Sequence, residues 1–264
     1  MLTLYVGSGG LGDSVILSSK LLNIISSIHS ARDTISYLHF ESDKRKDYGP
    51  VLVAFWELVR TEAMKHIRDF TFDISFYKHG DFWSIVPRYV FNMATGLTTQ
   101  VDGLCVDPPS IVSKRAIDRI GSRYVTLIVD GGQETRGLTI NAIEELRAAF
   151  PAYPIVLLGN KKRDFLFHLK PTSYSILNLT GETTIQEALE VVQDSDLVIG
   201  PDGILTYYSA MHGVPTTLIF HEAPLIKSYC VHELPYARAN VLIHPGYVND
   251  ANTLIALAKE LFQT

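Results

Sequence analysis

The sequence has few cysteines and no long apolar run. Its two cysteines, Cys105 and Cys230, lie far apart among 264 residues, so their spacing predicts neither a disulfide framework nor a zinc site. No apolar stretch reaches the roughly 18 residues that a membrane-spanning helix needs. Met1 leads into a strand-like run without a basic signal segment, so we expect a cytoplasmic protein with no integral membrane association.

An excess of positive charge is also lacking. The chain has 23 Lys and Arg against 28 Asp and Glu, a formal net charge of -5, which gives no general attraction to the phosphates of nucleic acids. What it does have is 47% hydrophobic residues. That share is enough to bury a sizeable core, and the length suits one large or two small domains.

Short β-rich runs alternate with helical patterns along the whole chain, which is typical of parallel sheets with crossover helices. In the first half we expect strands near 2–6, 34–40 and 71–77 and helices near 13–29, 50–67 and 82–95. In the second half we expect strands near 124–129, 154–158, 174–179, 196–199, 215–220 and 241–243, and helices near 139–149, 161–168, 184–193, 203–212 and 250–262. The proline-containing segment 107–114 is the expected linker, so the predicted domains are 1–110 and 111–264.

The opening turn, GSGGLGDS, fits the G-x-G-x-x-G pattern of a dinucleotide-binding turn through Gly7, Gly9 and Gly12. In such a fold an acidic residue about 20 residues further on binds the ribose of the dinucleotide. The candidate here, Glu41, is poorly placed because it lies nearer 30 residues away. Asp13 would also compete with a pyrophosphate for the amides of the helix N-terminus. The residues themselves leave two interpretations of Asp13 open: a helix cap, or a base that faces an incoming hydroxyl group.

Two segments resemble a known family. Residues 177–220 carry an N-L-x-G-x-T motif, a D-L-V-I-G-x-D strand end and a G-V-P-T turn, and the chain begins with a G-x-L-G-D motif. These segments resemble the ADP-heptose:lipopolysaccharide heptosyltransferase family, glycosyltransferase family 9, of the GT-B glycosyltransferases. The matching residues of the second segment are Asn178, Leu179, Gly181, Thr183, Glu187, Asp196, Gly200, Asp202, Gly213, Val214, Pro215 and Thr216.

The resemblance implies an α/β GT-B fold, in which two Rossmann-like domains with mostly parallel sheets face a cleft. It assigns the acceptor to 1–110 and the nucleotide-sugar donor to 111–264. It also implies an inverting, metal-independent transfer in which Asp13 is the general base, beside Gly10 and Gly12. Arg136 is the implied clamp on the donor diphosphate, because a guanidinium can hold two phosphate oxygens at once.

The remaining expected donor contacts lie in the loops of the second half. A helix N-terminus binds phosphate through its amides, and the turn at Asp202 and Gly203 leads into such a helix. Tyr207 stands where the family has a histidine. We further expect Gly131 and Gly132 to allow a tight loop near phosphate and Glu222 to contact the nucleotide ribose. The donor-binding set is therefore Gly10, Gly12, Gly131, Gly132, Asp202, Gly203, Ile204, Leu205, Thr206, Tyr207 and Glu222.

The expected function is a glycosyltransferase that uses a nucleotide-sugar donor and needs neither a cofactor nor a metal. Residues 194–196, DSD, fit the D-x-D pattern of a metal site, but they precede a strand and are expected at the edge opposite the donor. The acceptor would be a glycan or a hydroxymethylated base of phage DNA. Two alternatives of other classes are a NAD-dependent oxidoreductase that uses the Gly7–Gly12 turn and a non-catalytic sugar-nucleotide-binding module.

Overall fold

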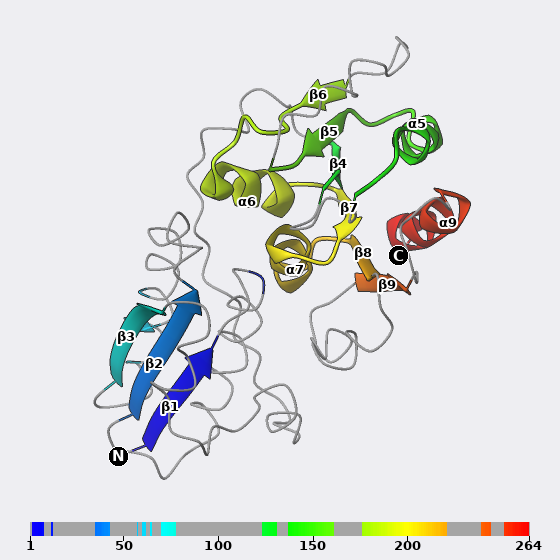
Figure 1. The fold of residues 1–264 in the computed structure, drawn as a ribbon. Coiled ribbons are helices and arrows are strands. Elements are labelled where there is room, and N and C mark those ends of the chain that lie inside the picture. Colours follow the sequence, from blue (N-terminus) through cyan, green and yellow to red (C-terminus); the bar gives the residue numbers. More distant parts are fainter. Residues whose placement is uncertain are drawn as a thin grey trace. The chain divides into compact units, whose positions relative to one another are not determined.

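The computed structural model describes residues 2–7, 12, 35–42, 57, 60–61, 64, 70–77, 123–130, 137–160, 176–220, 239–243 and 251–263. The chain forms two compact units, Met1–Ser110 and Ile111–Thr264. The strands described in each unit form one parallel sheet (Figure 1).

In the described part of the first unit, the sheet has the order β1-β2-β3. Its strands are β1 (Leu2–Gly7), β2 (Ile35–Ser42) and β3 (Phe70–Tyr77). They confirm the three strands that the sequence predicts in this half. The helices predicted at 13–29, 50–67 and 82–95 lie outside the described residues, apart from Glu57, Arg60 and Thr61, which are helical, and Met64, which lies in a turn.

The second unit contains a sheet of six described strands in the order β6-β5-β4-β7-β8-β9. Counted along the chain this order is 3-2-1-4-5-6, the arrangement of dinucleotide-binding folds. The strands are β4 (Val125–Ile128), β5 (Ile155–Leu158), β6 (Ile176–Asn178), β7 (Leu197–Pro201), β8 (Thr216–Phe220) and β9 (Ala239–Ile243). The helices are α5 (Ile140–Ala149), α6 (Ile185–Gln193), α7 (Ile204–Met211) and α9 (Ala251–Gln263).

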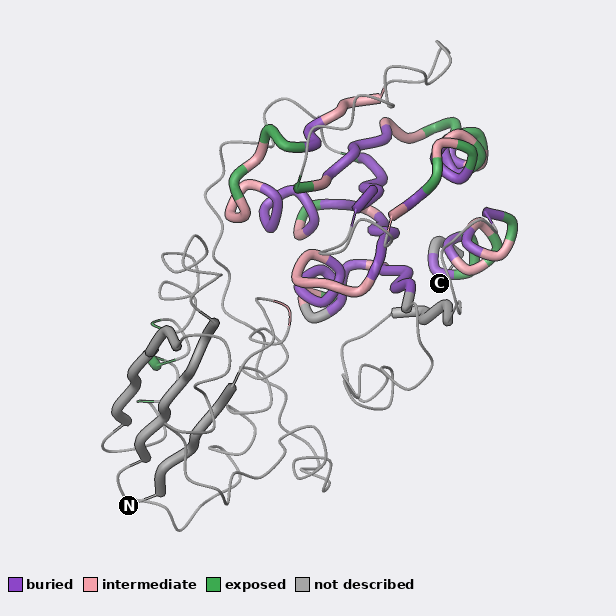
Figure 2. The backbone as a smooth tube through the Cα atoms, viewed as in Figure 1, coloured by how far each residue is buried: buried purple, intermediate pink, exposed green. Residues whose placement is uncertain are grey.

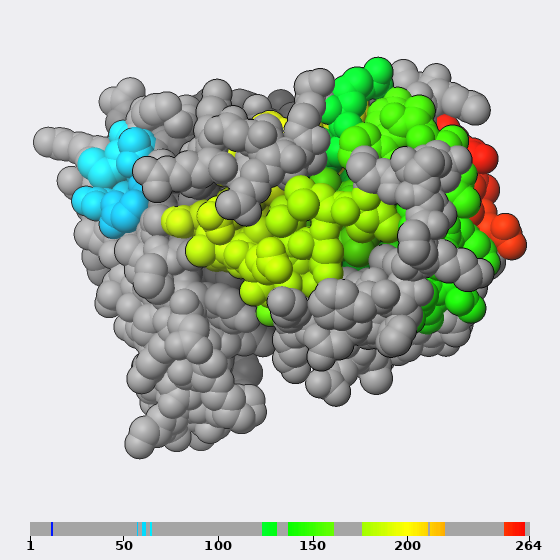
Figure 3. All heavy atoms as spheres, turned by 90° about the horizontal axis from the view of Figure 1, so that it is seen from above, coloured from blue at the N-terminus to red at the C-terminus, as the bar shows by residue number. Residues whose placement is uncertain are grey.

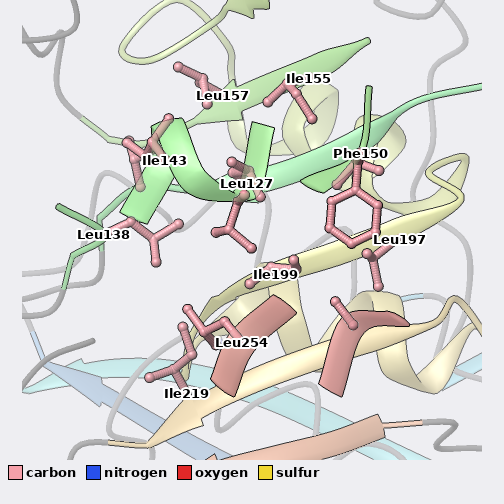
Figure 4. Packing of buried hydrophobic residues seen from close by; sticks show 14 of the residues in the cluster. Leu127, Leu138, Ile143, Phe150, Ile155, Leu157, Leu197, Ile199, Ile219 and Leu254 are labelled. Atoms are coloured by element: carbon pink, nitrogen blue, oxygen red, sulfur yellow. The ribbon is translucent and has the colours of Figure 1, made fainter. Parts of the chain in front are cut away.

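Helices cover both faces of this sheet (Figure 1). On one face, Leu127 and Ile199 pack with Ile143 of α5 and Leu254 of α9 (Figure 4). On the other face, strand residues such as Val198 pack in a second core cluster with Leu189 of α6 and Tyr208 of α7. These six strands and four helices confirm the elements predicted for the second half, and the helix predicted at 161–168 lies outside the described residues.

The central strands are buried along their whole length, which explains their composition. Every residue of β4, β5 and β7 is buried (Figure 2). A parallel strand covered on both faces needs apolar side chains on both, so β5 reads IVLL without alternation.

No helix in the described part of the chain is long and apolar enough to cross a membrane.

The amino edge of the sheet is held by Asp196. Its carboxylate Oδ2 accepts from Tyr124 N–H at 2.9 Å, and its own N–H donates to Tyr124 O at 3.0 Å. Both residues come just before their strands, which confirms that the DSD segment lies at the amino edge.

Burial, together with the nearby carboxylates, raises the pKa of Tyr124 above its ordinary value, and the neutral phenol donates to Val191 O at 2.8 Å.

Candidate functional site

The topology of the second unit places a candidate site at the carboxyl edge, between β4 and β7. These strands are neighbours, with Leu127 paired to Ile199. From β4 the chain runs to α5, which covers one face, and from β7 it runs to α7, which covers the other. Ligands of open α/β sheets bind at such a switch point, outside the carboxyl ends of the strands.

The turn from β7 into α7 forms one side of this site. Asp202 is half-buried, and its N–H donates to Ile219 O at 3.0 Å, which fixes the turn to β8. Gly203 is the N-cap residue, with extended backbone, and no side chain caps the helix. The first N–H groups of a helix have no partner within it, so the start of α7 offers amides and a positive dipole end to an anion.

The first turn of α7 presents its backbone rather than its polar side chains. Thr206 is fully buried, and its hydroxyl group shares its proton between Pro201 O and Gly203 O, each at 3.0 Å. Tyr207, at the position of the family's histidine, is 2% exposed. Ile204 and Leu205 are half-buried and pack against the core on that face. Contacts from this turn to a ligand would therefore come from the amides.

The end of β4 forms the other side of the site. Asp130 pairs with Gly137 in an isolated antiparallel bridge, and Leu138 N–H donates to Val129 O at 3.2 Å. A side chain at Gly137 would bring its Cβ within 2.6 Å of Val129 O, so glycine allows this close approach. Gly137 thus lies beside Asp130 at the carboxyl end of β4.

The loops after β5 and β6 are joined to each other at the same edge. Asn178 closes a local turn. Its Oδ1 accepts from the N–H of Thr180 at 3.1 Å and from the hydroxyl group of Thr180 at 2.7 Å. Gly181 adopts a positive φ of 66°, which favours glycine, and its N–H donates to Gly159 O at 2.8 Å. Gly181 and Glu182 are exposed, and Figure 3 shows part of the yellow-green segment after residue 176 at the surface.

Several residues that carry the family resemblance have structural roles here. Among the matching residues, Glu187 forms a reciprocal capping box with Thr184 at the start of α6. Gly213, with φ 74°, follows the C-cap of α7, and its N–H and that of Val214 bond back to Ala210 O and Ser209 O in a Schellman motif. A Cβ at Gly200 would lie 2.5 Å from that of Ile128, so this glycine lets β7 pack beside β4.

Six residues that the sequence assigns to the site lie outside the described residues: Asp13, Gly10, Gly131, Gly132, Arg136 and Glu222. Gly12 is described and is helical and half-buried. Asp202 and Gly203 lie at the switch point. Asp130 has no role among the residues expected from the sequence, although a carboxylate directly after an apolar strand at this edge is a visible signal. Among the described residues, no three His, Cys, Asp or Glu side chains are grouped as a metal would require.

No family model matches the sequence, and no curated protein matches it. Several solved structures do match the fold of this chain. The chain is similar to the ADP-heptose lipopolysaccharide heptosyltransferase II of E. coli, with a TM-score of 0.55, 13% identity and coverage of 100% of this chain and 99% of the other. It is also similar to a family 9 glycosyltransferase of Veillonella parvula, with a TM-score of 0.58, 10% identity and coverage of 99% and 95%.

A third similar structure is the E. coli heptosyltransferase WaaC, solved with ADP, with a TM-score of 0.55, 10% identity and coverage of 99% and 100%. Likeness at this level of identity concerns the fold. It extends over nearly the whole of each chain, and the six-strand order of the second unit is that of a Rossmann-like domain. The α/β GT-B fold predicted from the sequence is therefore confirmed.

Proposed function

We propose that this protein is a glycosyltransferase that moves a sugar from a nucleoside-diphosphate sugar to an acceptor hydroxyl group. The supporting observation is the uncapped start of α7 at the switch point between β4 and β7. An anion-binding helix start at that position suits a diphosphate. A similar structure, WaaC, was solved with ADP.

In the proposed mechanism, Asp13 removes the proton of the acceptor hydroxyl group as its oxygen attacks the anomeric carbon. The bond between that carbon and the diphosphate oxygen breaks on the opposite side, so the configuration inverts. Arg136 and the first amides of α7 take up the negative charge of the departing nucleoside diphosphate. These groups do what a divalent ion does in other sugar-transfer enzymes, so the reaction proceeds without metal.

The donor site can be tested at Gly203, because the structure allows a side chain there. A Cβ at this position meets no atom within 4 Å, and its φ of 168° is extended backbone that any residue adopts. In Gly203→Asp, the carboxylate would cap α7 and compete with the diphosphate for the same amides. We expect at least tenfold weaker ADP or UDP binding by calorimetry, with unchanged or higher thermal stability.

Gly203→Ala is the matched control, since it adds a Cβ without an anion. Full nucleotide binding by Gly203→Asp would refute the assignment of the diphosphate to α7. An equal loss in both variants would instead place ligand atoms directly against Gly203.

A thermal-shift panel of nucleotide-sugars, with NAD beside it, tests the class of reaction. A ligand at 100 times its dissociation constant stabilises a protein by about 2.7 kcal/mol. Stabilisation by nucleotide-sugars followed by transfer to glycan or hydroxymethylated DNA acceptors would support the proposal and identify the acceptor. Stabilisation by NAD alone would support the oxidoreductase, and binding without transfer or hydrolysis would support a non-catalytic module.

A further inference from the structure

The hydrogen-bond ladder between β4 and β5 changes partner at the carboxyl edge. Val125 N–H donates to Pro154 O, and Val129 N–H to Leu158 O at 2.8 Å. In a parallel ladder the next bond would run from Asn160 N–H to Val129 O. Instead, Asn160 N–H donates to the carboxylate Oδ1 of Asp130 at 2.8 Å. The side chain of Asp130, two residues after the end of β4, has replaced the backbone acceptor.

This replacement leaves Val129 O for another donor. It accepts from Leu138 N–H at 3.2 Å, next to the bridge between Asp130 and Gly137. The Asp130 carboxylate therefore does two things at once. It holds Asn160 at the beginning of the loop after β5, and it leaves Val129 O to accept from Leu138 N–H at the end of β4.

The carboxylate lies directly over a glycine of the neighbouring strand end. A Cβ at Gly159 would come within 3.0 Å of Asp130 Cγ and of both carboxylate oxygens. Gly159 O accepts in turn from Gly181 N–H, which belongs to the loop after β6. Three consecutive loop starts, after β4, β5 and β6, are thus connected through Asp130 and the backbone around Gly159.

We propose that Asp130 is a positioning residue for the nucleoside-diphosphate subsite. It is 6% exposed, so it acts through the loops that it holds rather than by meeting the ligand. The inference rests on the proposed function, because those loops start at the edge that we assign to the donor.

Four variants of the full chain test the link between carboxylate and loops. Asp130→Ala removes the acceptor, whereas Asp130→Asn keeps an oxygen that can accept from Asn160 N–H. Gly159→Ala pushes a methyl group against the carboxylate, and in the double variant Asp130→Ala/Gly159→Ala that methyl group meets no carboxylate. ADP affinity, and the KM and kcat for a nucleotide-sugar, are measured for each variant.

We expect Asp130→Ala and Gly159→Ala each to bind ADP about tenfold more weakly, equivalent to about 1.4 kcal/mol, with KM rising more than kcat falls. Asp130→Asn should remain within about threefold of the wild type. The Gly159→Ala change should cost less than twofold in the Asp130→Ala background. Additive losses, an Asn variant as weak as the Ala variant, or unchanged affinity in all four would overturn the proposal.

Amide hydrogen exchange gives a readout that needs no ligand. Asp130→Ala should speed exchange at Asn160 and Leu138 at least tenfold, while Asp130→Asn and the amides of β8 stay close to wild type. Unchanged exchange at both residues would refute the positioning role even if ADP binds. If wild type fails to bind ADP or UDP while these exchange rates change as expected, the proposed function fails and the loop connection stands.

Discussion

At the scale of single residues, two adjacent threonines of β8 offer a direct comparison. Thr216 and Thr217 are both fully buried. The Thr216 hydroxyl group bonds with Ser209 Oγ at 2.9 Å and Val214 O at 2.8 Å, whereas Thr217 Oγ1 has no hydrogen-bond partner among the described residues. A buried hydroxyl group without a partner costs stability.

We therefore expect Thr217→Val, which has nearly the same shape, to stabilise the protein by about 1 kcal/mol. Thr216→Val, its matched control, should destabilise by about 1–2 kcal/mol because it also leaves Ser209 without that partner. Urea denaturation of both variants against wild type measures the difference. A loss of stability in Thr217→Val would mean that its hydroxyl group has a partner in solution.

The catalytic role of Asp13 is a second prediction at this scale. Asp13→Asn keeps the size of the side chain but cannot remove a proton, so transfer should fall by on the order of 100- to 10,000-fold. Nucleotide binding should remain nearly intact, because the carboxylate is not needed to hold the diphosphate. Turnover of a nucleotide-sugar and ADP affinity are measured side by side, and wild-type turnover would reduce Asp13 to a helix cap.

The role of Arg136 is separable from that of Asp13. Arg136→Ala should weaken both nucleotide binding and rate, since a charge-assisted contact to the diphosphate is worth roughly 1.5–3 kcal/mol. Calorimetry with ADP measures the loss, and Lys259→Ala, at an exposed position of α9, is the control for a general effect of removing positive charge. Unchanged affinity in Arg136→Ala would contradict this role, and Lys161 and Lys162 would be the next candidates for the clamp.

At the scale of elements, the start of α6 depends on a local device. Thr184 Oγ1 accepts from Glu187 N–H at 3.3 Å, and Thr184 N–H donates to Glu187 Oε2 at 2.8 Å. Thr184→Ala should cost about 1 kcal/mol, as loss of an N-cap does. Urea denaturation measures it, with the neighbouring Thr183→Ala as control. Equal effects of both changes would show that the cap contributes nothing specific.

The boundaries of the elements follow from such local signals. Apolar runs that lack alternation predict the buried strands β4 and β5, and the T-x-x-E pattern predicts where α6 begins. Gly213 marks the end of α7 because its positive φ favours glycine. These signals lie within a few residues of the boundary, so they are available to a sequence reader without the tertiary structure.

At the scale of the whole molecule, the metal requirement distinguishes the proposed mechanism from others. Asp196, the last residue of the DSD segment, bonds to Tyr124 at the amino edge, far from the carboxyl ends of the strands. We expect full transfer activity in excess EDTA, measured with the donor identified by the thermal-shift panel. Loss of activity in EDTA and recovery with magnesium or manganese would contradict the metal-independent mechanism and the role given to Arg136.

The sequence by itself determined the α/β class, the described strands and helices, and the Asp202–Gly203 turn, because each depends on short-range periodicity or on turn chemistry. Only the tertiary structure decided which strand ends meet. The order β6-β5-β4-β7-β8-β9 brings Asp130 to Asn160, 30 residues away, and Asp196 to Tyr124, 72 residues away. Nothing in the local pattern of an aspartate indicates such a partner, because the partner is set by which strands become neighbours when the helices cross over the sheet.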